Sequence, residues 1–508
     1  MRFLLWLFCP LLVATQVPAQ PSHADSTNSP VFRSYRSRNP LPVPEETDAT
    51  WQMWLTFMAS QKANAGDVLA QHELGLRFLL GRGVAADTVK GAYWIQRAAS
   101  RNLVPARFNL GILELNGWGV AWNPFEAYRQ FEYCANTGMV EARYIVGLIY
   151  TENLVVPRDL VRARQWLAMA ADSGYAPARD AIRQIEAMTR TQDSPDSTGV
   201  TAGLLFGGFE DDSSSARSDA TLLRDALEQA GPEVRKALGI AGLADSSAQI
   251  DATTLSSLQS AAAAGSPEAL SVIGRCYERG TLVRKDPVLA AMYYVRAIRL
   301  DYPRASEYLW RLLQEESFYG VLTAQAGEGN VNARYTWATL SAIGFGGVLF
   351  RHNVFITDQQ ALGFLRYNVQ KQDPQSMIEL GLWYYGGRAG TEDVERAVSL
   401  WRDAAGLGSA EAKLRIAVTT VRASRDSAAV REAVAVLTDA SAGGSVLAQV
   451  ALGYCYETGR GVARNTTEAV RLYRSGAQRG SQDAYRALRR MYDAVRPPDR
   501  AFEIPYGM

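Results

Sequence analysis

The sequence contains very few of the side chains on which most catalytic and metal-binding sites depend. Its 508 residues include only three histidines, His23, His72 and His352, which fall in three different parts of the chain. No C-x-x-C, H-E-x-x-H, phosphate-loop or G-x-S-x-G motif is present. We therefore predict no catalytic site, no cofactor and no metal site. A pair of carboxylates for glycoside hydrolysis stays formally open, because sequence alone does not show which carboxylates converge.

An excess of charge and a membrane-spanning segment are also missing. Lys and Arg number 53 against 52 Asp and Glu, so nothing electrostatic favours nucleic acid as a partner. The apolar run at residues 3–13 follows Arg2 and precedes Val17-Pro18-Ala19, a pattern typical of a cleaved secretory signal peptide at residues 1–19. It is about half the ~20 residues that a membrane anchor needs. We predict an exported protein with no integral membrane segment in the mature chain.

Cysteine is scarce as well. Removal of Cys9 with the signal peptide leaves Cys134, Cys276 and Cys455, an odd number that excludes complete internal pairing. We predict that all three are buried thiols.

What the sequence does contain is a repeat of 36 residues. Alanines that open a first helix recur at Ala70, Ala106, Ala142 and Ala178, and again at Ala412, Ala448 and Ala484. Glycines stand five residues after four of these positions, where they allow close helix packing, and eleven residues after three of them, where they end helices. Asp or Asn precedes each second helix as an N-cap. This pattern predicts an all-α solenoid of stacked helix pairs.

The period divides the chain into parts. We predict a disordered leader at 20–46, a first array at 47–187 that begins with a half-repeat cap at Trp51 to Ala65, and a flexible linker at 188–218. A second array with a divergent cap follows at 219–493. The tail at 494–508 contains Pro497 and Pro498 and is expected to fray.

The best-preserved unit, Ala448 to Asn465, reads A-x3-L-G-x2-Y-x2-G-x-G-V-x2-N. This pattern resembles the Sel-one-like repeat (SLR) family of tetratricopeptide-like proteins. The resemblance implies a right-handed superhelix that acts as a scaffold or adaptor, often in the bacterial periplasm or secreted, and it implies no catalytic residue. Some members join the two helices of a unit by a disulfide. This chain departs from that pattern, with Ala297 and Gly476 at the partner positions of Cys276 and Cys455.

Helical geometry suggests where a protein or peptide partner binds. In each first helix the residues two, six and nine after the opening alanine share a stripe, which lines the concave groove of related tetratricopeptide arrays. In the first array this stripe is apolar, and we predict it to be the binding site. Its residues are His72, Leu76, Leu79, Phe108, Ile112, Leu115, Tyr144 and Leu148. The alternative is that the stripe is filled by the chain itself.

A second candidate surface is the lengthened segment between Ile343 and Asp358, where the spacing exceeds the period by seven residues. Insertions in solenoids fall in loops on one face, which is often the binding face. The candidate recognition loop contains Phe345, Phe350, Arg351, His352 and Phe355. The alternative is that these aromatic residues fold back onto neighbouring helices. For the whole protein, a glycan-binding or glycan-processing accessory role in the cell envelope is the alternative to protein binding.

Overall fold

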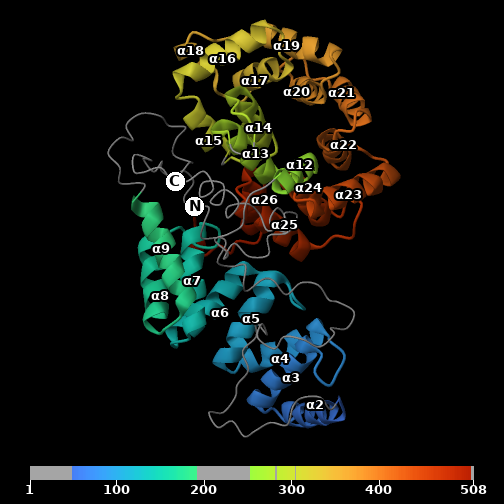
Figure 1. Cartoon of the computed structure of the whole chain (residues 1–508). Helices are drawn as coiled ribbons and strands as arrows, with labels where there is room; N and C mark the ends of the chain where they lie inside the picture. The colour runs from blue at the N-terminus through green and yellow to red at the C-terminus, as the bar shows by residue number, and fades with distance from the viewer. Residues whose placement is uncertain (1–48, 191–251, 281–282, 304, 505–508) are drawn as a thin grey trace. The chain divides into compact units, whose positions relative to one another are not determined.

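The computed structural model describes residues 49–190, 252–280, 283–303 and 305–504, and every regular element in these ranges is a helix. The predicted signal peptide and leader lie outside the described residues, as do most of the linker and the divergent cap of the second array. The chain forms two compact units. The first consists of residues 1–210 and 488–508, and the second of residues 211–487. Figure 1 shows the helices in chain order.

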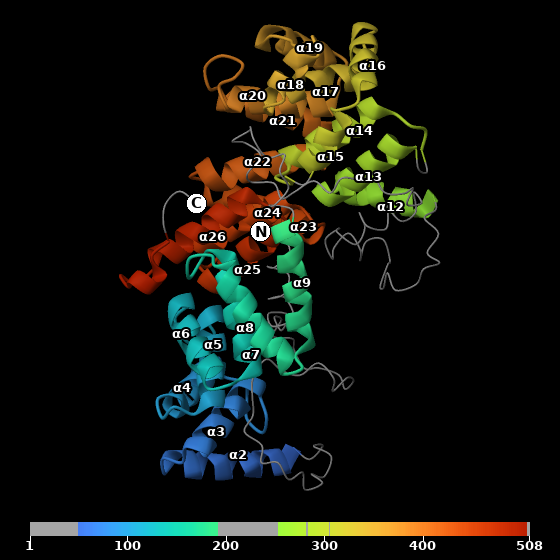
Figure 2. The ribbon, with the colours of Figure 1, turned by 90° about the vertical axis from the view of Figure 1, so that its left-hand side faces the viewer.

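The first unit stacks α2 to α9 in chain order (Figure 2). Consecutive helices pack against one another, as a solenoid requires. The helices are α2 (Ala49–Asn64), α3 (Val68–Leu80), α4 (Thr88–Ala99), α5 (Val104–Asn116), α6 (Pro124–Asn136), α7 (Val140–Glu152), α8 (Leu160–Asp172) and α9 (Ala176–Arg190).

The second unit continues the helix pairs. Its helices are α12 (Ala252–Ala263), α13 (Pro267–Arg279), α14 (Pro287–Arg299), α15 (Ala305–Leu312), α16 (Glu316–Gly327), α17 (Val331–Ala342), α18 (Gly346–Arg351), α19 (Asp358–Gln370), α20 (Pro374–Tyr385), α21 (Val394–Gly406), α22 (Ala410–Ala423), α23 (Ser427–Ala442), α24 (Val446–Thr458) and α25 (Thr466–Gln478). The boundary between the units falls inside α26 (Gln482–Ala494), which the short 3-10 helix η3 (Arg500–Phe502) follows.

The predicted start signals are confirmed. Asp87, Asn123 and Asp286 accept hydrogen bonds from backbone amides in the first turns of α4, α6 and α14. Ser266 and Ser445 do the same for the first helices α13 and α24. Because these bonds satisfy amides that have no partner inside the helix, they set where each helix begins.

The predicted glycine positions are also confirmed. Gly81, Gly117 and Gly459 adopt left-handed backbone angles where α3, α5 and α24 end. Inside the first helices, a Cβ on Gly453 would lie 2.6 Å from the ring of Tyr473, and one on Gly381 would lie 2.3 Å from Trp401 Nε1. Each glycine therefore lets a large aromatic residue of the second helix pack against the backbone of the first.

Two local predictions are wrong. The segment between Ile343 and Asp358 is not only a loop, because α18 forms inside it and buries Val348 and Leu349. The end of the chain does not fray as far as it is described, because Phe502 is 1% exposed and packs on α6 of the first unit. In both places buried apolar side chains outweigh the turn-forming Gly and Pro residues around them.

Candidate interaction surfaces

The predicted groove stripe lies on α3, α5 and α7 of the first unit, and most of it is buried. Phe108 is 1% exposed and Tyr144 is 2% exposed. Leu79 and Leu115 are half-buried. The buried members are His72, Leu76, Phe108, Ile112, Tyr144 and Leu148. As placed, these six residues contribute to packing within the chain rather than to an open surface.

Contacts between helices account for part of this burial. His72 Nε2 lies 2.9 Å from Asn109 Nδ2, which links α3 to α5 in the next repeat. The ring of Phe108 packs edge-on against Phe131, with centroids 5.6 Å apart, and a Cβ on Gly111 would lie 2.9 Å from the same Phe131 ring. The stripe thus joins one repeat to the next through His72, and joins the two helices of a single repeat through Phe108. Helical periodicity could not reveal this, because more than one face of a first helix contacts neighbours.

The candidate recognition loop has a different character. Phe350 is 69% exposed and Phe355 is 52% exposed, and their rings lie edge to face with centroids 6.2 Å apart. Arg351 is exposed as well, and Phe345 is half-buried. His352 does not join the exposed pair, because its ring stacks on Tyr319 at 4.1 Å. The structure therefore divides the predicted loop residues into an exposed set and a packed set.

Contacts on either side hold this loop in place. Trp337 Nε1 donates a hydrogen bond of 2.7 Å to the carbonyl oxygen of Val354. Leu349 is fully buried and Ile356 is 5% exposed. The backbone that carries Phe350 and Phe355 is thus held in place by the buried Leu349 and Ile356 next to them and by the hydrogen bond to Val354 between them.

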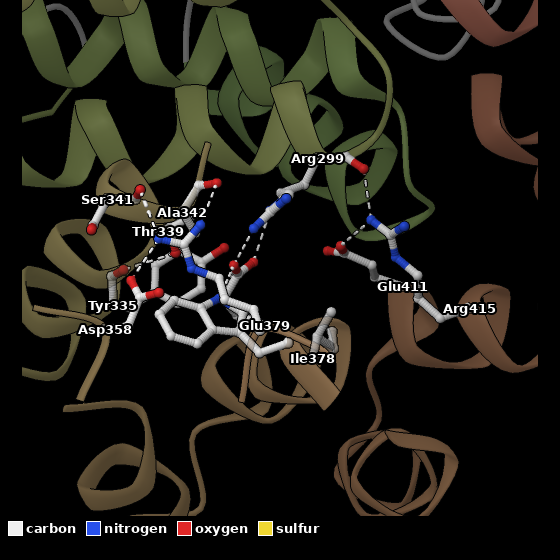
Figure 3. Close-up of polar contacts among 12 residues, drawn as sticks. Arg299, Tyr335, Thr339, Ser341, Ala342, Asp358, Ile378, Glu379, Glu411 and Arg415 are labelled. Atoms are coloured by element: carbon white, nitrogen blue, oxygen red, sulfur yellow. Dashed lines mark hydrogen bonds and ion pairs between the residues drawn. The ribbon is translucent and has the colours of Figure 1, made fainter. Parts of the chain in front are cut away.

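A buried ionic network, which the sequence analysis missed, joins α14, α20 and α22 of the second unit (Figure 3). Arg299 forms a bidentate ion pair with Glu379, in which the distance from Nε to Oε2 is 2.9 Å. Glu379 is 1% exposed. Glu379 also accepts a hydrogen bond of 2.9 Å from Trp383 Nε1. Arg415 donates through Nη2 to the carbonyl oxygen of Arg299 at 2.7 Å.

The other half of the network centres on Glu411. Arg415 lies 3.5 Å from one of its carboxylate oxygens and Arg296 lies 3.7 Å from the other. The three arginines are thus matched by only two glutamates. Buried charges stabilise a fold only when they are paired, so this network fixes the relative positions of three helices rather than adding much net stability.

The first and last repeats of the second unit are also joined. Arg479, which follows α25, donates to both carboxylate oxygens of Glu268 on α13 at 2.7 Å. The side chains are 7% and 2% exposed. Arg479 also donates to Gln449 and to the carbonyl oxygen of Gly444. In the described part of the second unit, the first and last helix pairs of the solenoid are therefore in contact.

The C-terminal segment packs on the first unit through aromatic and charged side chains. The ring of Phe502 lies 5.1 Å from Phe125 and 5.8 Å from Tyr128. Arg496 donates to the carbonyl oxygens of Leu154 and Val155, which follow the end of α7. These carbonyl groups lie in the loop after α7, and the guanidinium provides them with hydrogen-bond donors.

One carboxyl group in the first unit has an unusual environment. Burial raises the pKa of Glu114 on α5 from 4.5 to about 8, and the nearby Glu126 carboxylate adds to the rise. Because the pKa of Glu114 is higher in the folded chain than in the unfolded chain, the free energy of unfolding is highest below pH 4.5. It falls as the pH rises through about 8, because the unfolded chain then gains an ionised carboxylate that the folded chain disfavours.

We expect the first unit to melt at a lower temperature at pH 8 than at pH 5, and Glu114→Gln to reduce that difference. Asp172→Asn, at an exposed position at the end of α8, is the control that should leave it unchanged. Thermal melts of the full chain across this pH range provide the measurement. An unchanged pH difference in Glu114→Gln would contradict the assignment.

The three predicted thiols are confirmed. Cys134, Cys276 and Cys455 are free and buried. Burial raises the pKa of Cys134 to about 12 and those of Cys276 and Cys455 to about 11, so none is a reactive thiolate near neutral pH. In the described ranges no cluster of three or more His, Cys, Asp or Glu residues is arranged to hold a metal ion. None of the helices described is both long and apolar enough to cross a membrane.

Comparison with known proteins gives the class. The Sel1 repeat model matches six segments, residues 68–103, 104–129, 140–175, 267–302, 374–409 and 446–481. Five of these segments are 36 residues long and each spans one helix pair, while the segment 104–129 spans α5 and ends inside α6. The chain belongs to the Sel1 repeat family, whose tetratricopeptide-like fold is that of a protein-interaction scaffold.

Several solved structures are similar to the chain. A protective antigen from uropathogenic Escherichia coli strains, described as displaying an SLR fold, shares 19% identity, with 87% of this chain and 91% of that chain covered and a TM-score of 0.29. A Sel1 repeat protein from Oxalobacter formigenes shares 30% identity over 25% of this chain and 96% of its own, with a TM-score of 0.24. Yeast Tom70 shares 12% identity, with 84% of this chain and 95% of that chain covered and a TM-score of 0.26. No curated protein matches the sequence.

Proposed function

We propose that this protein is an exported scaffold that binds a protein or peptide partner, and that the loop carrying Phe350 and Phe355 makes the contact. The observation that carries the proposal is the pair of exposed phenylalanine rings on an anchored loop. Exposed aromatic residues held in a fixed geometry commonly supply the anchors of protein interfaces. Export is supported by the signal-like pattern at residues 1–19.

The chemistry of the loop favours a peptide over a glycan. Between residues 343 and 357 the only acidic or basic side chain, apart from His352, is that of Arg351. Carbohydrate sites commonly combine exposed aromatic rings with carboxylates, and the one carboxylate beside this segment, Asp358 at its end, is paired with Arg388. An apolar pair beside one guanidinium suits a segment with apolar side chains and an acidic or carbonyl group.

We expect Phe350→Ser with Phe355→Ser to lower partner affinity by about 30- to 1,000-fold, since two aromatic anchors are worth about 1–2 kcal/mol each. Partners captured from envelope extract by the full chain are identified by mass spectrometry, and their affinities are then measured with purified components. Val161→Ser, at a residue of the first unit that is 69% exposed, is the matched control. Equal affinities for the double variant and the wild type would refute the proposal.

A further inference from the structure

The C-terminal segment, residues 495–504, contacts other parts of the first unit with side chains at three-residue intervals. Arg496, Asp499 and Phe502 make these contacts. The residues between them are exposed, apart from the half-buried Pro497. Residues 500–502 form the 3-10 helix η3, a geometry in which side chains three residues apart point to the same side. The segment therefore presents one face to the first unit, as a bound peptide does.

Phe502 is the central anchor of the segment, and it packs on α6. Its ring lies 5.1 Å from the ring of Phe125 and 5.8 Å from that of Tyr128, and both pairs meet edge to face. The guanidinium carbon of Arg129 lies 5.3 Å from the centroid of the same ring. Because Phe502 is 1% exposed, its ring is fully enclosed.

Two charged side chains of the segment make polar contacts beside this ring. Arg129 Nη2 donates to Asp499 Oδ2 at 3.1 Å. Arg496 Nη2 donates to the carbonyl oxygen of Leu154 at 2.6 Å, and Nη1 donates to that of Val155 at 3.0 Å. Ionised groups form stronger and more directional hydrogen bonds than neutral ones, so these contacts fix the register of the segment. The residues that receive it, which we call the α6 site, are Phe125, Tyr128, Arg129, Leu154 and Val155.

The α6 site lies on a face that is open to solvent in the neighbouring repeats. Phe125 is the second residue of its helix, and the second residues of α4 and α8 are Val89 and Val161. These valines are 65% and 69% exposed, whereas Phe125 is 1% exposed. Stacking of the repeats therefore does not bury this position. Side chains of α26 and of the C-terminal segment cover Phe125 instead, among them Tyr492 and Phe502.

Few side chains hold the C-terminal segment in the α6 site. Of residues 495–504, only Phe502 and Ile504 are buried. The side chains of Arg129 and Asp499 are 43% and 46% exposed, so solvent screens their ion pair. A short segment with so few buried residues opens more readily than the helix pairs. The segment is thus built as an exchangeable occupant of the site.

We propose that the α6 site binds an extended segment of a partner protein, and that the C-terminal segment occupies it as a tethered ligand in the free chain. The occupant shows which chemistry the site accepts. It offers a cation, an acid and an aromatic ring in the order Arg-x-x-Asp-x-x-Phe. A partner segment with these side chains at this spacing displaces residues 495–504 and takes over their contacts. This site is separate from the loop that carries Phe350 and Phe355.

The first test vacates the α6 site in the full chain and adds its occupant back as a probe. Asp499→Ala with Phe502→Ser removes two of the three contacting side chains. The probe is a fluorescein-labelled peptide of residues 495–504, and fluorescence anisotropy measures its Kd. A short tether gives an effective concentration of about 1 mM, so a probe with a Kd of about 100 µM should bind the wild type about ten-fold more weakly than the vacated variant.

The neighbouring repeats supply a matched pair of controls. Phe125→Val gives α6 the residue that α4 and α8 carry at the same position, so the fold should be retained, which circular dichroism checks. Added to the vacated variant, it should weaken probe binding at least about ten-fold, because the ring beneath Phe502 is lost. Val161→Ser, added in the same way, should leave the Kd unchanged.

Two further peptides test the chemistry of the partner. A glycine and serine peptide that keeps only the Arg, Asp and Phe of the segment at their spacing should bind the vacated variant within about ten-fold of the probe, because a few anchors carry most of the binding energy. The same peptide with its Phe moved by one position should not bind. If both peptides bind equally, or neither binds, the assigned partner chemistry is wrong.

Three other results would overturn the proposal. Equal probe affinities for the wild type and the vacated variant, or no binding to either, would show that the C-terminal segment does not compete for the site. Unfolding of the first unit in the vacated variant would show that the segment is part of the core. A wild-type dimer in sedimentation velocity that is lost in Phe502→Ser would assign the site to a second copy of the chain.

Discussion

Replacing Arg479 with methionine is expected to destabilise the second unit by about 3–5 kcal/mol, because it leaves the Glu268 carboxylate buried without its partner. Both carboxylate oxygens accept hydrogen bonds from Arg479, and the site is almost completely excluded from solvent. Denaturant unfolding followed by hydrogen exchange in α13 and α24 gives the measurement. The loss should appear at both ends of the unit, since this ion pair joins them.

Two further variants test the cause. Arg486→Ala removes a surface ion pair with Asp483 and should change stability by less than about 1 kcal/mol. Combining Arg479→Met with Glu268→Met should recover much of the lost stability, because two apolar side chains leave no buried charge. If Arg479→Met behaves like Arg486→Ala, the two ends of the unit do not depend on this contact.

Replacing Phe108 with alanine is expected to destabilise the first unit by about 3–5 kcal/mol, the usual loss for a buried aromatic residue. Phe108 packs against Phe131, and Gly111 leaves space for that ring beside the α5 backbone. Thermal and denaturant unfolding of the full chain measure the effect.

Phe350→Ala is the matched control, because the same side chain is 69% exposed there and its loss should change stability by no more than about 0.5 kcal/mol. The pair of variants also tests the predicted groove. If Phe108→Ala keeps its stability but loses partner binding, the stripe is a partner surface after all. If it unfolds, the stripe belongs to the packing of the helices within the first unit.

The helix pairs, their period and their ends could be predicted because they depend on neighbouring residues. Asp87 caps α4 through an amide three residues away, and Gly81 ends α3 through its own backbone angle. Several repeats also carry the glycine that their own second helix requires, as Gly453 does for Tyr473. Such signals lie within a single 36-residue unit and repeat with it.

The availability of each predicted surface was decided by tertiary structure. The sequence determined that Phe108 and Phe350 are apolar and that one lies in a helix stripe and the other in an insertion. Only the packing of helices against one another decided that the first is buried, in part against Phe131 of the next helix, and that the second is exposed. Contacts such as Glu268 with Arg479 join residues 211 positions apart. They arise because a small rotation between successive repeats accumulates along the solenoid, and no single unit of sequence specifies that rotation.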